Sequence, residues 1–239
     1  MMNHIFVALD VDTAEAAHAL ADKLRGVVGG FKIGSRLFTS HGPSIVEALV
    51  ARGDRVFLDL KFHDIPNTVA GAVAAATRLG VWMVNVHASG GHAMMKAAVE
   101  AADAESSRLS RPRPLVIAVT MLTSLSEETM GEIGVAGAMA SQVGRLAVLA
   151  QSAGLDGVVA SAQEIALIRN RCGKTFEIVT PGIRSASDDK GDQRRTMTAA
   201  EALAAGASYL VVGRPIIADG DPRAAAERID AECRAAVRC

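Results

Sequence analysis

Three charged residues near position 60 have a spacing that could support proton-transfer chemistry. Asp59 and Lys61 are separated by one residue at the end of an apolar, strand-like run, so on a strand their side chains point to the same face. Asp64 follows three residues after Lys61. Carboxylates beside an ammonium group hold a lysine in its charged form, and such a lysine can stabilise a developing anion and then protonate it. A structural salt-bridge network is the alternative, and Asp64 is also a candidate N-cap for the next helix.

Other polar residues also stand where apolar runs end. Asp10 follows one such run, Lys32 lies within a second, and His87 closes a third. One charge of this kind is as often a solvated rim residue as a functional group, but several that converge favour a functional site. We interpret His87 as structural, because no acidic partner for it is evident. The array that we expect to alternate in charge comprises Lys32, Asp59, Lys61 and Asp64.

The elements that must position these residues alternate along the whole chain. Short β-branched runs predict strands, and alanine-rich stretches with helical periodicity lie between them. The expected strands are His4–Asp10, Gly30–Ile33, Arg55–Lys61, Met83–His87, Leu115–Thr120, Gly157–Ala160, Glu177–Thr180 and Tyr209–Gly213. The expected helices are Thr13–Arg25, Pro43–Arg52, Thr68–Leu79, Gly91–Ser107, Ser141–Ala153, Ala162–Arg171, Thr198–Ala205 and Pro222–Val237.

This alternation predicts an α/β fold, a single (β/α)8 barrel whose one domain covers residues 1–239. Glycines follow four of the expected helices, where a residue with positive φ commonly ends a helix. They are Gly53, Gly80, Gly154 and Gly206. A doubly wound open sheet gives a similar alternation, but the first strand–helix turn lacks the glycine-rich fingerprint of a dinucleotide fold.

Composition limits the classes of partner. Half of the 239 residues are apolar, 21% are charged, and the net charge is −1, so we expect no nucleic-acid or membrane partner. The three cysteines have no metal-ligand spacing and fit reduced thiols. A strand-like run begins almost at the N-terminus, and no segment approaches the roughly 20 apolar residues of a membrane span. We therefore expect a cytoplasmic protein.

Two connections, Met121–Ala140 and Pro181–Met197, are longer than the others. Both follow a predicted strand, on the side where barrel enzymes place their chemistry, and both are candidate lids. For the first, a loop that carries an extra short helix is the alternative.

The segment Asp59–Thr68 resembles, almost residue for residue, the signature of the orotidine 5'-phosphate decarboxylase family. Further segments match in the family's order: Ala8–Asp10, Phe31–Gly34, Thr120–Ser124, Pro181–Arg184, Gly191–Arg195 and Gly213–Pro215. The resemblance implies the barrel fold and the decarboxylation of orotidine 5'-phosphate to UMP in pyrimidine biosynthesis. It also implies that no metal or organic cofactor takes part.

The resemblance also implies roles for individual residues. Lys61 acts as the proton donor, with Asp59, Asp64 and Lys32 as the other catalytic residues, and His63 is a structural neighbour. The implied substrate-binding residues are Asp10, Lys32, Thr68, Thr123, Arg184, Gln193, Gly213 and Arg214. Gly213 and Arg214 follow the last strand and open a helix, where free N–H groups favour a phosphate. In the family, residues matching Asp64 and Thr68 reach the neighbouring subunit's site, which implies a homodimer.

Two alternatives remain open at this point. A metal-dependent phosphosugar aldolase or decarboxylase on the same barrel would use Asp59 and Asp64 beside Mg²⁺. A catalytically silent nucleotide-binding barrel belongs to a different class, and we would expect it to lose one of the four charged positions, all of which are filled here. The segments Ile65–Thr68 and Gly191–Gln193 favour the nucleotide enzyme.

Overall fold

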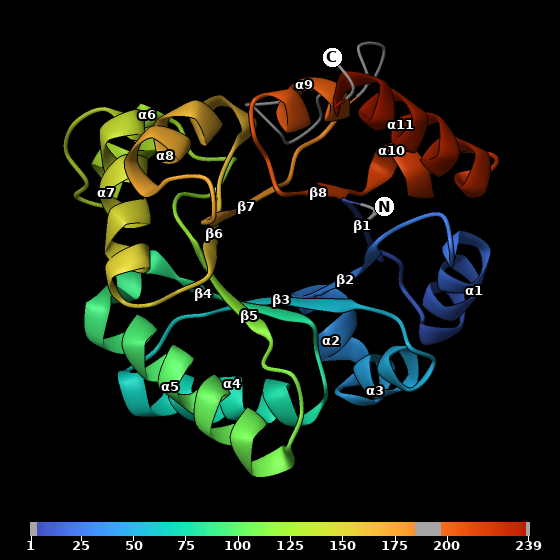
Figure 1. Ribbon diagram of the computed structural model, residues 1–239, viewed down its shortest axis with the longest axis horizontal. Helices are drawn as coiled ribbons and strands as arrows, with labels where there is room; N and C mark the ends of the chain where they lie inside the picture. The colour runs from blue at the N-terminus through green and yellow to red at the C-terminus, as the bar shows by residue number, and fades with distance from the viewer. Residues whose placement is uncertain (1–3, 185–196, 238–239) are drawn as a thin grey trace.

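Eight parallel strands form a closed barrel in chain order in the computed structural model, which describes residues 4–184 and 197–237 (Figure 1). The first strand pairs with the last, which closes the ring. The strands are β1 (Ile5–Ala8), β2 (Gly30–Gly34), β3 (Val56–Phe62), β4 (Met83–His87), β5 (Leu115–Val119), β6 (Gly157–Val159), β7 (Glu177–Thr180) and β8 (Tyr209–Val212). The predicted barrel is confirmed, and β2 and β3 each run one residue past their predicted ends.

Helices form the outer layer and surround the barrel (Figure 1). The α-helices are α1 (Ala14–Leu24), α2 (Ser35–His41), α3 (Ser44–Ala51), α4 (Pro66–Arg78), α5 (Gly91–Leu109), α6 (Glu127–Glu132), α7 (Met139–Ser152), α8 (Ile165–Cys172), α9 (Ala199–Ala204), α10 (Arg214–Ile217) and α11 (Pro222–Val237). Two single-turn 3₁₀ helices are η1 (Ala88–Gly90) and η2 (Ala162–Glu164). The four glycines predicted to end helices adopt φ angles of 82°, 78°, 85° and 107°.

The helix prediction differs from the structure in several places. The helix α2 was not predicted; Gly42, with a φ of 66°, separates it from α3. The first long connection contains α6, which confirms the alternative of an extra short helix. Helix α4 begins at Pro66 rather than Thr68, because the ring of a proline fixes φ at a helical value. Its N-cap is Ile65, so the prediction that Asp64 is the N-cap is wrong.

Two hydrophobic clusters build the core, one on each side of the barrel wall. Alternate strand residues pack outward against the helices, and the others point inward. The inward cluster includes stacked rings of Phe6 and Trp82, with centroids 4.9 Å apart, and Tyr209 meets both edge-on. These rings fill the barrel interior near the N-terminal ends of the strands. Polar groups can therefore occupy the interior at the C-terminal ends. No helix among residues 4–184 and 197–237 is long and apolar enough to cross a membrane.

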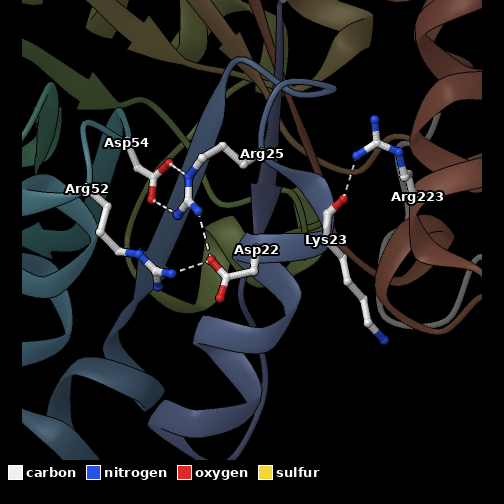
Figure 2. Close-up of polar contacts among 6 residues, drawn as sticks. All are labelled: Asp22, Lys23, Arg25, Arg52, Asp54 and Arg223. Atoms are coloured by element: carbon white, nitrogen blue, oxygen red, sulfur yellow. Dashed lines mark hydrogen bonds and ion pairs between the residues drawn. The ribbon is translucent and has the colours of Figure 1, made fainter.

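A polar network joins helix α1 to the segment that enters β3 (Figure 2). Arg25 donates from Nε and Nη2 to the two oxygens of Asp54, at 2.8 and 2.6 Å, and from Nη1 to Asp22 at 2.8 Å. The Asp54 side chain is only 5% exposed, whereas Arg52, which also contacts Asp22, is 40% exposed. Arg223 in α11 donates to the carbonyl oxygen of Lys23. The network therefore ties the first and last helices and β3 together at the end of the barrel where strands begin.

We expect Arg25→Ala to lower the free energy of unfolding by about 1–3 kcal/mol, because it leaves the Asp54 carboxylate buried without its bidentate partner. The matched control is Arg52→Ala, which removes one exposed ion pair and should change stability by less than about 1 kcal/mol. Urea unfolding followed by circular dichroism measures both changes. Equal midpoints for the two variants would contradict the structural role of the Arg25–Asp54 pair.

Candidate active site

A cavity of about 740 Å³ opens at the end of the barrel where the strands finish. It is the face on which barrel enzymes place their catalytic groups. Eight of the residues that the sequence predicts for a site line this cavity. They are Asp10, Lys32, Asp59, Lys61, Thr123, Arg184, Gly213 and Arg214. Residues from opposite ends of the chain therefore meet in one chamber.

A chain of opposite charges runs along one wall of the cavity. The Nζ of Lys61 lies 2.7 Å from Oδ1 of Asp59, and the Nζ of Lys32 lies 3.4 Å from the other oxygen, Oδ2. Lys32 also lies 3.4 Å from Oδ1 of Asp10. Lys32 is 8% exposed, so both of its carboxylate neighbours compensate a charge that is largely removed from water. The wall thus presents two ammonium groups held by carboxylates.

Asp59 is the central carboxylate of this network. Burial by itself raises the pKa of Asp59, but the positive charges of Lys32 and Lys61 and hydrogen bonds from Lys61 and Asn85 lower it. The net result is a pKa below the ordinary value of an aspartate, so Asp59 is ionised at neutral pH. A fixed anion therefore sits between the two lysines.

Strand β3 is irregular where it carries Lys61. Lys61 has a φ of 53°, in the left-handed region that residues with a side chain rarely adopt, and the register between β3 and β4 shifts between Leu58 and Phe62. The backbone N–H of Lys61 donates to Oδ1 of Asn85, at 2.8 Å. Asn85 was not predicted as a site residue. Its signal was a polar residue between Val84 and Val86 in an otherwise apolar part of β4.

Asp64 and Thr68 do not line the cavity. Both are exposed, and the carboxylate of Asp64 accepts a hydrogen bond from the N–H of the next residue, Ile65, at 2.6 Å. The chain turns outward after β3 ends at Phe62, which carries Asp64 away from Lys61. The expected array of four charges within one chain is therefore incomplete: the structure brings together Lys32, Asp59 and Lys61, adds Asp10, and leaves Asp64 on the surface.

Three of the groups predicted to bind a phosphate line the cavity where β7 and β8 end: Arg184, Gly213 and Arg214. Gly213 is the N-cap of α10, and Arg214 is its first residue, so the helix that they open is this short one and not the final helix. A Cβ atom on Gly213 would lie 3.7 Å from Cβ of Ala8, which shows how closely β1 and β8 approach here. Arg184 is 9% exposed. Gln193 lies outside the described residues, as does most of the second long connection.

The rings of His63 and His87 lie side by side, with centroids 5.4 Å apart. Neither residue lines the cavity. Burial, followed by the nearby charges of His63 and Lys61, lowers the pKa of His87, which keeps this imidazole neutral at physiological pH. In the part of the chain that the structure describes, no three His, Cys, Asp or Glu side chains are grouped so that they could hold a metal ion.

Comparisons with known proteins identify the family to which this arrangement corresponds. Residues 3–229 match the model of the orotidine 5'-phosphate decarboxylase / HUMPS family. A protein of Moorella thermoacetica named orotidine 5'-phosphate decarboxylase is 57% identical over 95% of this chain and 91% of its own length. A protein of the same name from Alkalilimnicola ehrlichii is 54% identical over 98% of each chain. The crystal structure of orotidine 5'-phosphate decarboxylase from Lactobacillus acidophilus superposes with a TM-score of 0.86, at 37% identity, over 97% of this chain and 99% of that one.

Proposed function

Because the chain belongs to the orotidine 5'-phosphate decarboxylase / HUMPS family, we infer that it is a carboxy-lyase that converts orotidine 5'-phosphate to UMP and CO₂. Relatives that bear the decarboxylase name match it over nearly its whole length. The observation that carries the proposal is the position of Lys61 in the cavity, 2.7 Å from an ionised Asp59. This reaction belongs to pyrimidine biosynthesis.

The chemical difficulty of this reaction explains why fixed charges are needed. The bond between C6 of the pyrimidine and its carboxyl carbon breaks, CO₂ departs, and the electron pair remains on C6. That pair lies in the plane of the ring and cannot delocalise into the carbonyl π system. A cation held near C6 before the reaction stabilises the developing negative charge without reorganising during the step. Lys61 is the residue to which we assign this task.

Lys61 then completes the reaction as a general acid. A proton from its ammonium group is transferred to C6, which gives UMP and a neutral amine, and solvent restores the ammonium group. We assign Asp59 to the region beside the departing carboxylate, where it also holds the Nζ of Lys61 in place. Lys32 and Asp10 lie next along the network, and we assign them to the ribose hydroxyls. Thr123, in the first long connection, is assigned to the pyrimidine ring.

We assign the substrate phosphate to the wall formed by Gly213 and Arg214, with Arg184 and Gln193 as further contacts. An arginine offers a bidentate partner to phosphate, and binding energy collected at this remote group can help to order the reacting end. The proposal is supported by the position of Arg214 in the same cavity as Lys61.

We expect Arg214→Ala to lower kcat/KM for orotidine 5'-phosphate by about 10²–10³-fold, since it removes a charge-assisted contact worth on the order of 3 kcal/mol. With orotidine, which lacks the phosphate, the same substitution should have little effect on kcat/KM. Steady-state kinetics with both substrates test this. An equal loss for the two substrates would argue that Arg214 acts elsewhere than at the phosphate.

We also propose a homodimer whose sites are shared between subunits. The exposed segment 63–68 supports this, because it contains the two predicted site residues that do not reach their own cavity. Ile65 in this segment is 67% exposed, as expected for an apolar side chain that a partner covers. We propose no nucleic-acid partner, and we place the enzyme in the cytoplasm with its phosphorylated substrate.

The metal-dependent phosphosugar enzyme is less well supported by the geometry. Each oxygen of Asp59 already faces an ammonium group, and a divalent cation at this carboxylate would meet two positive charges. We expect the purified protein to consume orotidine 5'-phosphate at the same rate with and without excess EDTA. The fall in ultraviolet absorbance of the substrate measures the rate. Complete loss of activity in EDTA, restored by Mg²⁺, would favour the metal enzyme, and no activity in any condition would contradict the decarboxylase.

A further inference from the structure

Asn85 is a fully buried polar residue in the wall of the barrel, with 0% of its surface exposed. Its neighbours in β4, Val84 and Val86, pack outward into the helix layer, so Asn85 points inward with Met83. We propose that Asn85 is a positioning residue for the decarboxylation, because one neutral amide fixes both the backbone of Lys61 and the carboxylate of Asp59. This inference rests on the proposed function of the site.

The first contact of Asn85 is with the backbone that carries Lys61. Leu58 pairs with Val84 and Phe62 pairs with Val86, so four residue steps on β3 are matched by two on β4. No residue of β4 is in register with β3 between these two pairs, and Oδ1 of Asn85 accepts the N–H of Lys61 there, at 2.8 Å. The contact therefore stabilises the unusual backbone conformation of Lys61, which has a φ of 53°.

The second contact of Asn85 is with Asp59. Nδ2 of Asn85 donates to Oδ1 of Asp59 at 2.7 Å, and the same oxygen accepts Nζ of Lys61 at 2.7 Å. Oδ2 of Asp59 is left to face Lys32. Only one orientation of the amide satisfies both neighbours, because Lys61 offers a donor and Asp59 offers an acceptor. The amide thus sets the rotation of the carboxylate that holds both ammonium groups.

An amide is the side chain that meets both requirements without adding charge. An aspartate has the same shape, but its second oxygen would face the Asp59 carboxylate at hydrogen-bond distance, where two anions cannot both persist. A leucine or alanine offers neither contact. Removing Asn85 should therefore displace the reactive nitrogen of Lys61 while leaving Gly213 and Arg214, to which we assign the phosphate, unchanged, because the two contacts of Asn85 are with Lys61 and Asp59.

The test compares Asn85→Ala and Asn85→Asp with Val84→Ala. The control shortens the adjacent residue of the same strand on its outward face, so it perturbs packing without touching the network. For Asn85→Ala we expect kcat to fall by about 10²-fold, the effect of misplacing a catalytic group by roughly 1 Å, with KM and the Kd for UMP within about threefold of wild type. Val84→Ala should lower the melting temperature and keep wild-type kcat.

The pH dependence of kcat in Asn85→Asp is a measurement that a purely structural role of Asn85 would not change. In Asn85→Asp, the introduced carboxylate would lie beside that of Asp59. The charged and titratable groups around this pair are Lys32 from β2, Lys61 from β3, His87 from β4, and Asp10 beyond Lys32. A second carboxylate raises the pKa of its neighbour, so Asp59 would become protonated at a higher pH as the solution is acidified. We expect the acid limb of the kcat profile to move to higher pH by about one unit or more.

Each outcome bears on the inference. Wild-type kcat in Asn85→Ala, or an unshifted pH profile in Asn85→Asp together with wild-type kcat, would overturn it. If Asn85→Ala does not fold, the isosteric Asn85→Asp decides alone. A wild-type protein without decarboxylase activity would instead contradict the proposed function, so the two failures are distinguishable.

Discussion

Replacing Lys61 with alanine is expected to reduce kcat for orotidine 5'-phosphate by about 10⁴-fold or more, while UMP still binds with a Kd within roughly tenfold of wild type. The substitution removes a fixed cation and a proton donor together, and each of these contributes on the order of 10²–10⁴-fold in enzymes. The groups to which we assign the phosphate follow β7 and β8 and should keep their positions. Nucleotide binding should therefore survive the loss of chemistry.

The matched control for this substitution is Lys96→Ala. Lys96 lies on the surface of α5, is 59% exposed, and forms an exposed ion pair with Glu100 four residues later. We expect wild-type kinetics for it. Single-turnover decarboxylation measured by release of CO₂ gives kcat for the slow variant, and isothermal titration with UMP gives the Kd. An active Lys61→Ala protein would exclude Lys61 as the proton donor and would require another cation in the cavity to take its place.

Mixing two inactive variants is expected to restore activity if the sites are shared across a dimer. Lys61→Ala and Asp64→Ala homodimers should each be inactive or nearly so. In a mixed dimer, one site combines Lys61 from one subunit with Asp64 from the other, and both residues are intact there. Random exchange makes about half of the dimers mixed, each with one working site of two, so we expect about one quarter of wild-type activity.

The structure offers a sharp negative control for this experiment. Lys32 and Lys61 both contact Asp59 of the same chain, so a mixture of Lys32→Ala with Lys61→Ala leaves every site without one of them. That mixture should gain no activity. Native mass spectrometry establishes whether mixed dimers form in each case. Mixed dimers of Lys61→Ala and Asp64→Ala that remain inactive would contradict the shared site.

The barrel and most of its strands were predictable because strand and helix periodicity is a local property of the sequence. Asp59 and Lys61 could be placed on one face for the same reason. The extra residues in β3 could not be predicted, since the bulge and the positive φ of Lys61 depend on the contact with Asn85 from another strand. The residues around Lys61 in the sequence do not indicate its positive φ, because lysine rarely adopts the left-handed conformation.

The position of Asp64 illustrates the other limit of sequence reasoning. Its spacing from Lys61 predicted a fourth member of the charged array, and its place before a proline predicted an N-cap. Both predictions depend on where the chain turns after β3, and the turn places Ile65 at the cap and Asp64 on the surface. A role for Asp64 then depends on a second copy of the chain, which a single sequence does not describe.

The closed barrel brings the charged wall and the assigned ring and phosphate contacts together from different halves of the gene. The charged wall, with Asp10, Lys32, Asp59, Lys61 and the amide of Asn85, comes from the first four strands and the residue that follows β1. The side chains to which we assign the pyrimidine ring and the phosphate, Thr123, Arg184 and Arg214, follow β5, β7 and β8. Mutations in the second half are therefore expected to alter binding of the ring and phosphate more than the charged wall to which we assign proton transfer. Such a partition allows new substrate preferences to evolve by recombination or drift in one half, while selection preserves the other.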